Sequence, residues 1–147
     1  MARSEGALTP SASRHLIAIA LLRSSRGYAR VSDVARRLGI TRGSASLTLK
    51  SLKKKGFVAE DENRFLVLTD KGQTEAEDGL GKQELLRRFL QEVLLCTPTA
   101  AQQDSSALAH SLSAEVAGRL ERFVAMVQSK QGDRLRAAWR EANRDYE

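Results

Sequence analysis

Cysteine, proline and long apolar runs are scarce in this chain of 147 residues. Its one cysteine, Cys96, excludes an intramolecular disulfide framework and a cysteine-rich zinc site. The longest apolar run, Leu16 to Leu22, is far shorter than the roughly 20 residues that span a bilayer. No signal-peptide cleavage pattern follows the first residues. We therefore expect a cytoplasmic protein that has no membrane partner.

Groups for catalysis are also few. The two histidines, His15 and His110, fall in different predicted helices. The sequence contains no glycine-rich phosphate loop, no HExxH motif and no CxxC motif. Cys96 is more simply explained as a structural thiol than as a redox sensor. We do not expect an enzyme.

Acidic residues are nearly missing from the first third of the chain. Residues 1–56 hold twelve Lys and Arg against two acids, a net charge of +10, whereas the remainder carries a net −4. This segregation predicts a surface for a polyanion such as double-stranded DNA. A solubilising basic surface is the alternative.

The spacing of apolar residues predicts a mostly α protein with a small β-wing. A first helix spans Pro10 to about Ser25, and a short helix capped by Ser32 ends at Gly39. A third helix is capped by Thr41 and ends at Gly56. Two helices joined by a tight turn predict a helix-turn-helix.

The third helix has two distinct faces. Ala45, Thr48, Leu49 and Leu52 recur at helical spacing and are expected to pack inward. Small residues begin the opposite face and lysines end it, which suits a helix that enters the major groove. An ordinary solvated face is the alternative. The outward residues are Gly43, Ser46, Leu47, Lys50 and Lys54, with Arg42 and Lys53 beside them.

Two short extended runs, FVAE and RFLVLT, follow this helix and predict a hairpin, or wing. We expect Asn63 to take the left-handed turn conformation. Arg64 lies near the tip, where it would reach a minor groove or a phosphate. Glu60, Asp61 and Glu62 argue against strong binding by the wing.

The rest of the chain is predicted to be helical. We expect disorder over 1–9, a winged-helix DNA-binding domain over 10–72 and a helical dimerisation domain over 73–147. A long linking helix, about 70–95, is capped by Thr69, a second covers about 99–111, and Ser113 caps a third. Helices beyond a complete winged helix must bury their apolar faces, and a homodimer is the simplest place. After Gly132, one face of a last helix carries Leu135, Ala138, Trp139, Ala142 and Tyr146.

Residues 27–72 resemble the winged helix of the iron- and manganese-dependent repressors, the DtxR/MntR family. The segments GYARVSDVARRLGI and FLVLTDKG match the family's patterns before the turn and at the close of the wing. QELLRRFLQEVL and LAHSLSAEVAGRLERFV resemble its dimerisation region. The resemblance covers about 10–128 and is nearer the short, two-domain type that lacks the SH3-like domain.

The resemblance implies a homodimeric repressor that binds a palindromic operator. Its base-reading positions fall on Thr41, Gly43 and Ser46, while Leu47 would contact a thymine methyl group or face solvent. The positions that match its DNA-backbone contacts are Arg30, Ser32, Arg42, Ser44, Thr48 and Lys50.

The resemblance also implies a divalent metal trigger, but the ligand positions are mostly replaced. They carry Arg14, Ile17, Gln83, Arg87, Ser106, Ala109 and His110. Mn²⁺ or Fe²⁺ binding draws on several carboxylate and imidazole donors, and only His110 supplies one. We therefore expect no metal cofactor; a rebuilt Mn²⁺ or Fe²⁺ site is the alternative.

Several alternatives stay open for the switch and for the function. Arg14 would tie the first helix to the dimerisation helices permanently, Arg14, Arg87 and His110 would bind an anionic effector, or the old site has simply decayed. In a second reading of the function, the winged helix is not a DNA-binding regulator but an interaction module that binds a protein or RNA. A regulator of the MarR kind, with a small-molecule pocket between its two parts, is the third reading.

Overall fold

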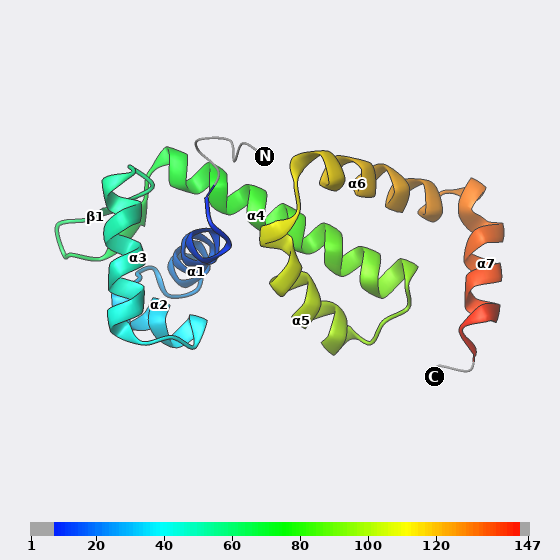
Figure 1. Ribbon diagram of the computed structural model, residues 1–147, viewed down its shortest axis with the longest axis horizontal. Helices are drawn as coiled ribbons and strands as arrows, with labels where there is room; N and C mark the ends of the chain where they lie inside the picture. The colour runs from blue at the N-terminus through cyan, green and yellow to red at the C-terminus, as the bar shows by residue number, and fades with distance from the viewer. Residues whose placement is uncertain (1–7, 145–147) are drawn as a thin grey trace. The chain divides into compact units, whose positions relative to one another are not determined.

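A computed structural model of the protein describes residues 8–144, and Figure 1 shows its elements. Residues up to Leu80 form one compact unit and residues from Gly81 form a second. The predicted class, mostly α with a small β-wing, is confirmed. In chain order the elements are α1 (Pro10–Arg26), α2 (Val31–Leu38), α3 (Arg42–Lys54), β1 (Val58–Glu60), β2 (Leu66–Leu68), α4 (Asp70–Arg88), a π-helical turn η1 (Phe89–Val93), α5 (Pro98–Leu108), a 3₁₀ turn η2 (Ala109–Ser111), α6 (Ala114–Gln128), a 3₁₀ turn η3 (Lys130–Gly132) and α7 (Asp133–Ala142).

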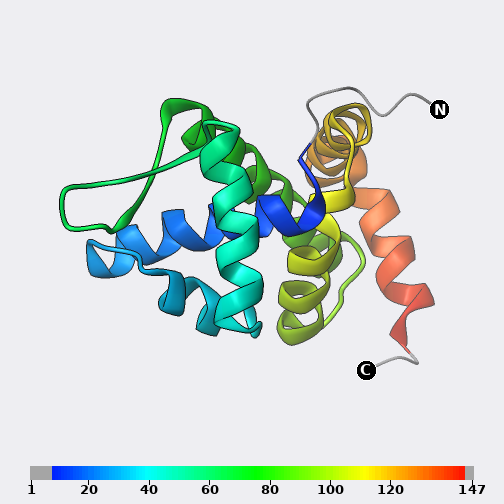
Figure 2. The same ribbon diagram turned by 60° about the vertical axis from the view of Figure 1, so that its left-hand side comes forward.

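Helix α1 forms the core of the first unit. It begins where the Ala12 N–H donates to Thr9 Oγ1 at 3.2 Å, with Pro10 in the first turn. Leu16, Ile19 and Leu22 are buried and pack with apolar side chains from α2, α3 and the hairpin. Figure 2 shows α3 crossing α1, with the hairpin projecting to one side. Because α1 meets α2, α3 and β2, it sets the positions of all three.

The start of α2 differs from the prediction. The helix begins at Val31 with Arg30 as its N-cap residue, so the expected cap by Ser32 is wrong. The Arg30 N–H donates instead to Asp33 Oδ2 at 3.2 Å. The helix start is therefore held by a carboxylate three residues into the helix, which accepts the N–H of the N-cap residue.

Helix α3 begins as the sequence predicts. The Ser44 N–H donates to Thr41 Oγ1 at 3.1 Å, which is the expected N-cap. Ala45, Leu49 and Leu52 are buried against the core, whereas Thr48 is only half-buried. The inward face is thus narrower than the four residues predicted.

The hairpin follows directly. Strands β1 and β2 are antiparallel, with Val58 opposite Leu68. The left-handed residue is Arg64, at φ 60°, so its assignment to Asn63 is wrong. The Leu66 N–H donates to Ala29 O at 2.8 Å, which joins the hairpin to the segment before α2.

The second unit is helical and less deeply packed. The long helix changes at Phe89 from α to a π-type turn. The predicted cap of α6 by Ser113 is confirmed, since its Oγ accepts from the Val116 N–H at 3.2 Å. Tyr146 and residues 1–7 lie outside the described residues. Within residues 8–144, no helix is long and apolar enough to cross a bilayer.

His15 is a buried titratable group on α1. Its side chain is 2% exposed, and Nδ1 lies 2.7 Å from Ser11 O. Nε2 is buried with no hydrogen-bond partner. Burial lowers the pKa of His15, and the charge of Arg14 acts in the same direction, although the bond to Ser11 O opposes them.

We expect this histidine to make the fold sensitive to acid. The unfolded chain takes up the proton near pH 6.5, whereas the folded chain resists it, so stability falls as the pH drops below about 6.5. His15→Leu should flatten this dependence in thermal unfolding between about pH 8 and about pH 5.5. An unchanged slope in the variant would place the sensitivity elsewhere.

Candidate nucleic-acid interface

The outward face of α3 presents short polar side chains, an apolar one and lysines. Arg42, Gly43, Ser46 and Lys50 are all exposed. Leu47, the apolar one, is 74% exposed. An exposed helix face with small residues at its beginning can approach base edges closely. Lys54 ends this face, also exposed.

Two hydroxyls of this helix are already engaged. Thr41 Oγ1 donates to Ser44 Oγ at 2.9 Å and accepts from the Ser44 N–H. These bonds hold the first turn of α3 in place. Thr41 and Ser44 thus set the helix terminus, and both remain exposed.

A notch beside the beginning of α3 brings four predicted site residues together. Arg30, Ser32, Arg42 and Arg64 line a hollow of about 560 Å³, which is completed by Val31, Asn63 and Phe65. These residues come from the beginnings of α2 and α3 and from the hairpin tip. The three guanidinium groups supply a concentration of positive charge with donors suited to phosphate oxygens.

Arg30 is held in the notch by two aromatic rings. Its guanidinium carbon lies 5.4 Å from the ring centroid of Tyr28 and 5.2 Å from that of Phe65. The two rings lie 5.1 Å apart. Cation–π attraction on this scale orients a guanidinium without neutralising it, so Arg30 keeps its charge for a ligand.

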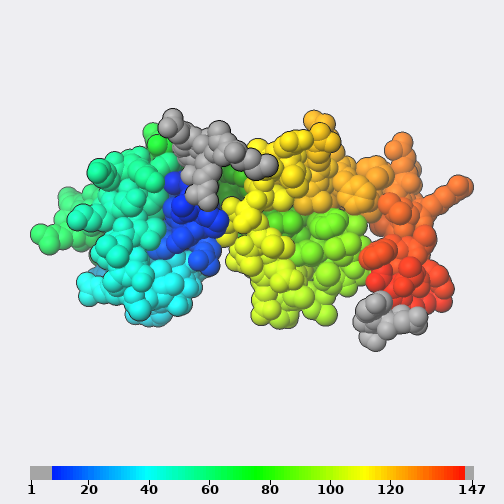
Figure 3. Space-filling model, viewed as in Figure 1, coloured from blue at the N-terminus to red at the C-terminus, as the bar shows by residue number. Residues whose placement is uncertain are grey.

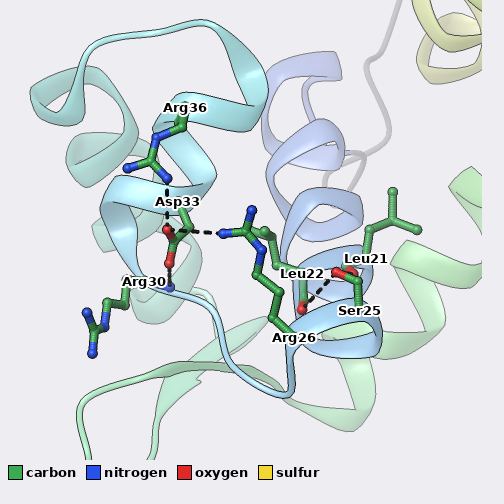
Figure 4. A network of polar contacts seen from close by, with 7 residues as sticks. All are labelled: Leu21, Leu22, Ser25, Arg26, Arg30, Asp33 and Arg36. Carbon is green, nitrogen blue, oxygen red and sulfur yellow. Dashed lines mark hydrogen bonds and ion pairs between the residues drawn. The ribbon is translucent and has the colours of Figure 1, made fainter.

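A second set of contacts near Arg30 is made by the carboxylate of Asp33. Figure 4 shows its carboxylate among Arg26, Arg36 and the Arg30 N–H. Asp33 Oδ1 lies 3.6 Å from Arg26 Nη1 and 3.4 Å from Arg36 Nη1, and its side chain is nearly buried. One acid in a basic segment therefore connects the end of α1 to α2.

Two of the three acids near the wing are occupied locally. Glu60 forms an ion pair with Lys53. Asp61 Oδ1 accepts the N–H groups of Asn63 and Phe65, each at 2.9 Å, and so shapes the loop. These acids therefore repel an anionic ligand less than their number in the sequence suggests.

Tyr28, Phe65 and Asp33 were not among the predicted site residues. Tyr28 and Asp33 stand inside the motif GYARVSD, so their spacing around Arg30 offered a signal. Phe65 begins the segment FLVLTDKG, but nothing in that segment indicated its contact with Arg30, because the two residues are 35 positions apart in the chain.

In the first unit, the family's metal-ligand positions hold no donor oxygen or imidazole. Arg14 is exposed on α1. Ile17 is buried and faces Gly79 of α4, where an added Cβ would lie 2.8 Å from Ile17 Cδ1. A packed isoleucine stands where a carboxylate ligand is needed.

In the second unit, the corresponding positions fit an ion no better. Ala109 is buried, and Gln83, Ser106 and His110 are partly buried. Arg87 donates to Glu84 at 2.8 and 2.6 Å, and this hydrogen bonding lowers the pKa of Glu84. Residues 8–144 contain no cluster of three His, Cys, Asp or Glu side chains suited to a metal. These residues do not fit Mn²⁺ or Fe²⁺, which prefer several carboxylate and imidazole donors.

Family models match both units. The model for the metal binding and dimerisation domain of iron dependent repressors matches residues 69–133, and a MarR family model matches residues 8–64. The HTH-type transcriptional regulator MntR of Lysinibacillus sphaericus (strain C3-41) is 36% identical over 85 residues, which cover 58% of this chain and 61% of that protein.

Solved structures share the fold. The manganese regulator SloR superposes with a TM-score of 0.71 at 24% identity, over 80% of this chain and 55% of that one. IdeR of T. acidophilum gives 0.67 at 24% identity, over 76% and 53%. The chain thus spans about three fifths of the curated relative and about half of these two structures.

The Asp33 network yields a test of the site's framework. Asp33→Asn should lower the free energy of unfolding by about 1–2 kcal/mol, because it removes a charge from a nearly buried, hydrogen-bonded carboxylate. Glu115→Gln, which breaks an exposed pair with Arg119, is the control and should cost about 0.5 kcal/mol or less. Equal losses in urea denaturation would show that Asp33 holds nothing in place.

Proposed function

Because this chain belongs to the DtxR/MntR family of iron- and manganese-dependent regulators, we propose that it binds duplex DNA and regulates transcription, as a repressor. The observation that carries the proposal is the notch where Arg30, Arg42 and Arg64 converge beside the exposed face of α3. A DNA-reading helix needs charged groups that contact phosphates and fix its position, and small side chains that approach the bases and read the sequence. The arginines of the notch suit the first task, and the small side chains of α3 suit the second.

We assign roles by chemistry. The arginines of the notch and Lys50 would contact phosphates. Further contacts to the DNA backbone would come from Ser32, Ser44, Thr48 and Lys54. Thr41, Gly43 and Ser46 would approach base edges, and exposed Leu47 would meet a thymine methyl group. The protein would act as a homodimer in the cytoplasm, with one α3 in each half of a palindromic operator.

We further propose that DNA binding needs no metal. Support comes from the replaced donor set, above all from Ile17, which is packed against Gly79. An exchange of Ile17 for a carboxylate would place a charge in this apolar contact. The alternative is an Mn²⁺- or Fe²⁺-responsive repressor that uses other donors.

An unbiased selection of duplex sequences tests the function. We expect a palindromic site to be enriched, and its affinity should fall steeply with salt, as release of counterions requires. A chelator should leave binding unchanged, and elemental analysis of the purified protein should find no stoichiometric metal. Failure to enrich any duplex would favour a module for protein or RNA. Loss of binding with chelator and recovery with Mn²⁺ or Fe²⁺ would establish the metal-responsive alternative.

A double-mutant cycle tests how Arg30 is positioned. Phe65→Leu should weaken binding to the selected duplex by about three- to tenfold, because Arg30 loses one ring contact. In an Arg30→Ala background the same change should have little effect. Phe65→Tyr keeps the ring and should restore binding. An undiminished effect of Phe65→Leu without Arg30 would assign Phe65 a purely structural role, which thermal unfolding would register.

A further inference from the structure

The second unit contains an apolar pocket that the DNA-binding role leaves unused. It has a volume of about 210 Å³ and lies where the π-helical turn η1 meets α6 and α7. Figure 3 shows α6 in amber and α7 in orange and red. The lining residues are Phe89, Val93, Leu94, Phe123, Val127, Leu135, Arg136 and Trp139.

The lining selects for an aromatic ligand. Phe89 and Phe123 meet edge to face, with centroids 6.3 Å apart, and Trp139 adds a third ring. Ring edges and faces offered in this way favour offset or edge-on contact with another ring. The pocket is somewhat larger than an apolar cavity of roughly 150 Å³ that binds benzene in another protein. It therefore suits one ring with a short substituent.

The single charged lining residue does not call for an anionic ligand. Arg136 Nη2 pairs with Asp133, and Nη1 donates to the carbonyl oxygen of Val127. Both terminal nitrogens are thus engaged within the second unit. A carboxylate in the pocket would have to compete with Asp133, so a neutral ligand is favoured.

The local backbone is also unusual. Residues Phe89–Val93 form a π-turn, in which the Leu94 N–H donates to Phe89 O at 3.0 Å. π-Helical turns are rare and are frequently found at functional sites. Here the turn contributes Phe89 and Val93 to the pocket wall.

We propose that this pocket binds a small, neutral, planar aromatic molecule. A small molecule fits this hollow better than a second copy of the chain, because the hollow admits only one or two side chains, whereas a stable interface buries about 800 Å² on each partner. Binding of this molecule is independent of DNA binding and of any metal.

Nitrobenzene is a suitable probe, because it is neutral and quenches tryptophan emission on contact. Trp139 is the only tryptophan in the chain, so its fluorescence reports on the pocket directly. We expect quenching of the full chain to saturate, with a dissociation constant of about 1 mM or below. Quenching that rises linearly, without saturation, would overturn the proposal.

Matched variants separate the pocket from the surface. Val93→Phe fills the pocket and should raise the dissociation constant at least about tenfold, while Val116→Phe, the same change at a 50% exposed position on α6, should leave it within about twofold. If Val93→Phe does not fold by circular dichroism, Leu135→Phe at the half-exposed rim replaces it. Equal affinities in both variants would contradict the assignment.

Two measurements would reveal whether a second copy of the chain, rather than a small molecule, occupies the pocket. Sedimentation of the wild-type chain and of the pocket-filling variant should give the same mass. If filling the pocket dissociated a dimer, or if nitrobenzene bound more weakly as protein concentration rose, the pocket would be an interface between copies and the proposal would be wrong.

Discussion

Burial of α1 is the constraint on which the first unit depends. Leu16, Ile19 and Leu22 are almost inaccessible to solvent, and α2, α3 and β2 all contact this helix. The direction in which α3 faces solvent therefore follows from its packing on α1, since the residues that contact the core leave only one face free.

The same burial includes Ile17, which stands at one of the positions where the resemblance implies a metal ligand. Ile17 belongs to the buried side of α1 and meets Gly79 of α4, where an added Cβ would displace the end of the Ile17 side chain. A carboxylate at that position would be a charge in an apolar contact unless an ion neutralised it. At this residue the chain therefore has an apolar contact in place of a carboxylate.

Charge and apolar surface are divided between the two units. The first unit gathers Arg30, Arg42 and Arg64 around one notch, where two aromatic rings hold Arg30, and its buried acid Asp33 pairs with Arg26 and Arg36. The second unit instead exposes large apolar side chains, including Phe123, Leu135 and Trp139. Basic surface suits a polyanion, and concave apolar surface suits a ligand with little charge, so the two units fit different partners.

The sequence by itself determined the helical class, the helix-turn-helix, the wing and the caps at Thr41 and Ser113, because each rests on local spacing and local hydrogen bonds. It did not determine the cap of α2, the left-handed residue of the hairpin or the π-turn, because more than one residue or local conformation was chemically suitable at each of these positions. Only the tertiary structure decided that Phe65 holds Arg30 and that η1, α6 and α7 line a common pocket. Such contacts join residues far apart in the chain, and no periodicity records them.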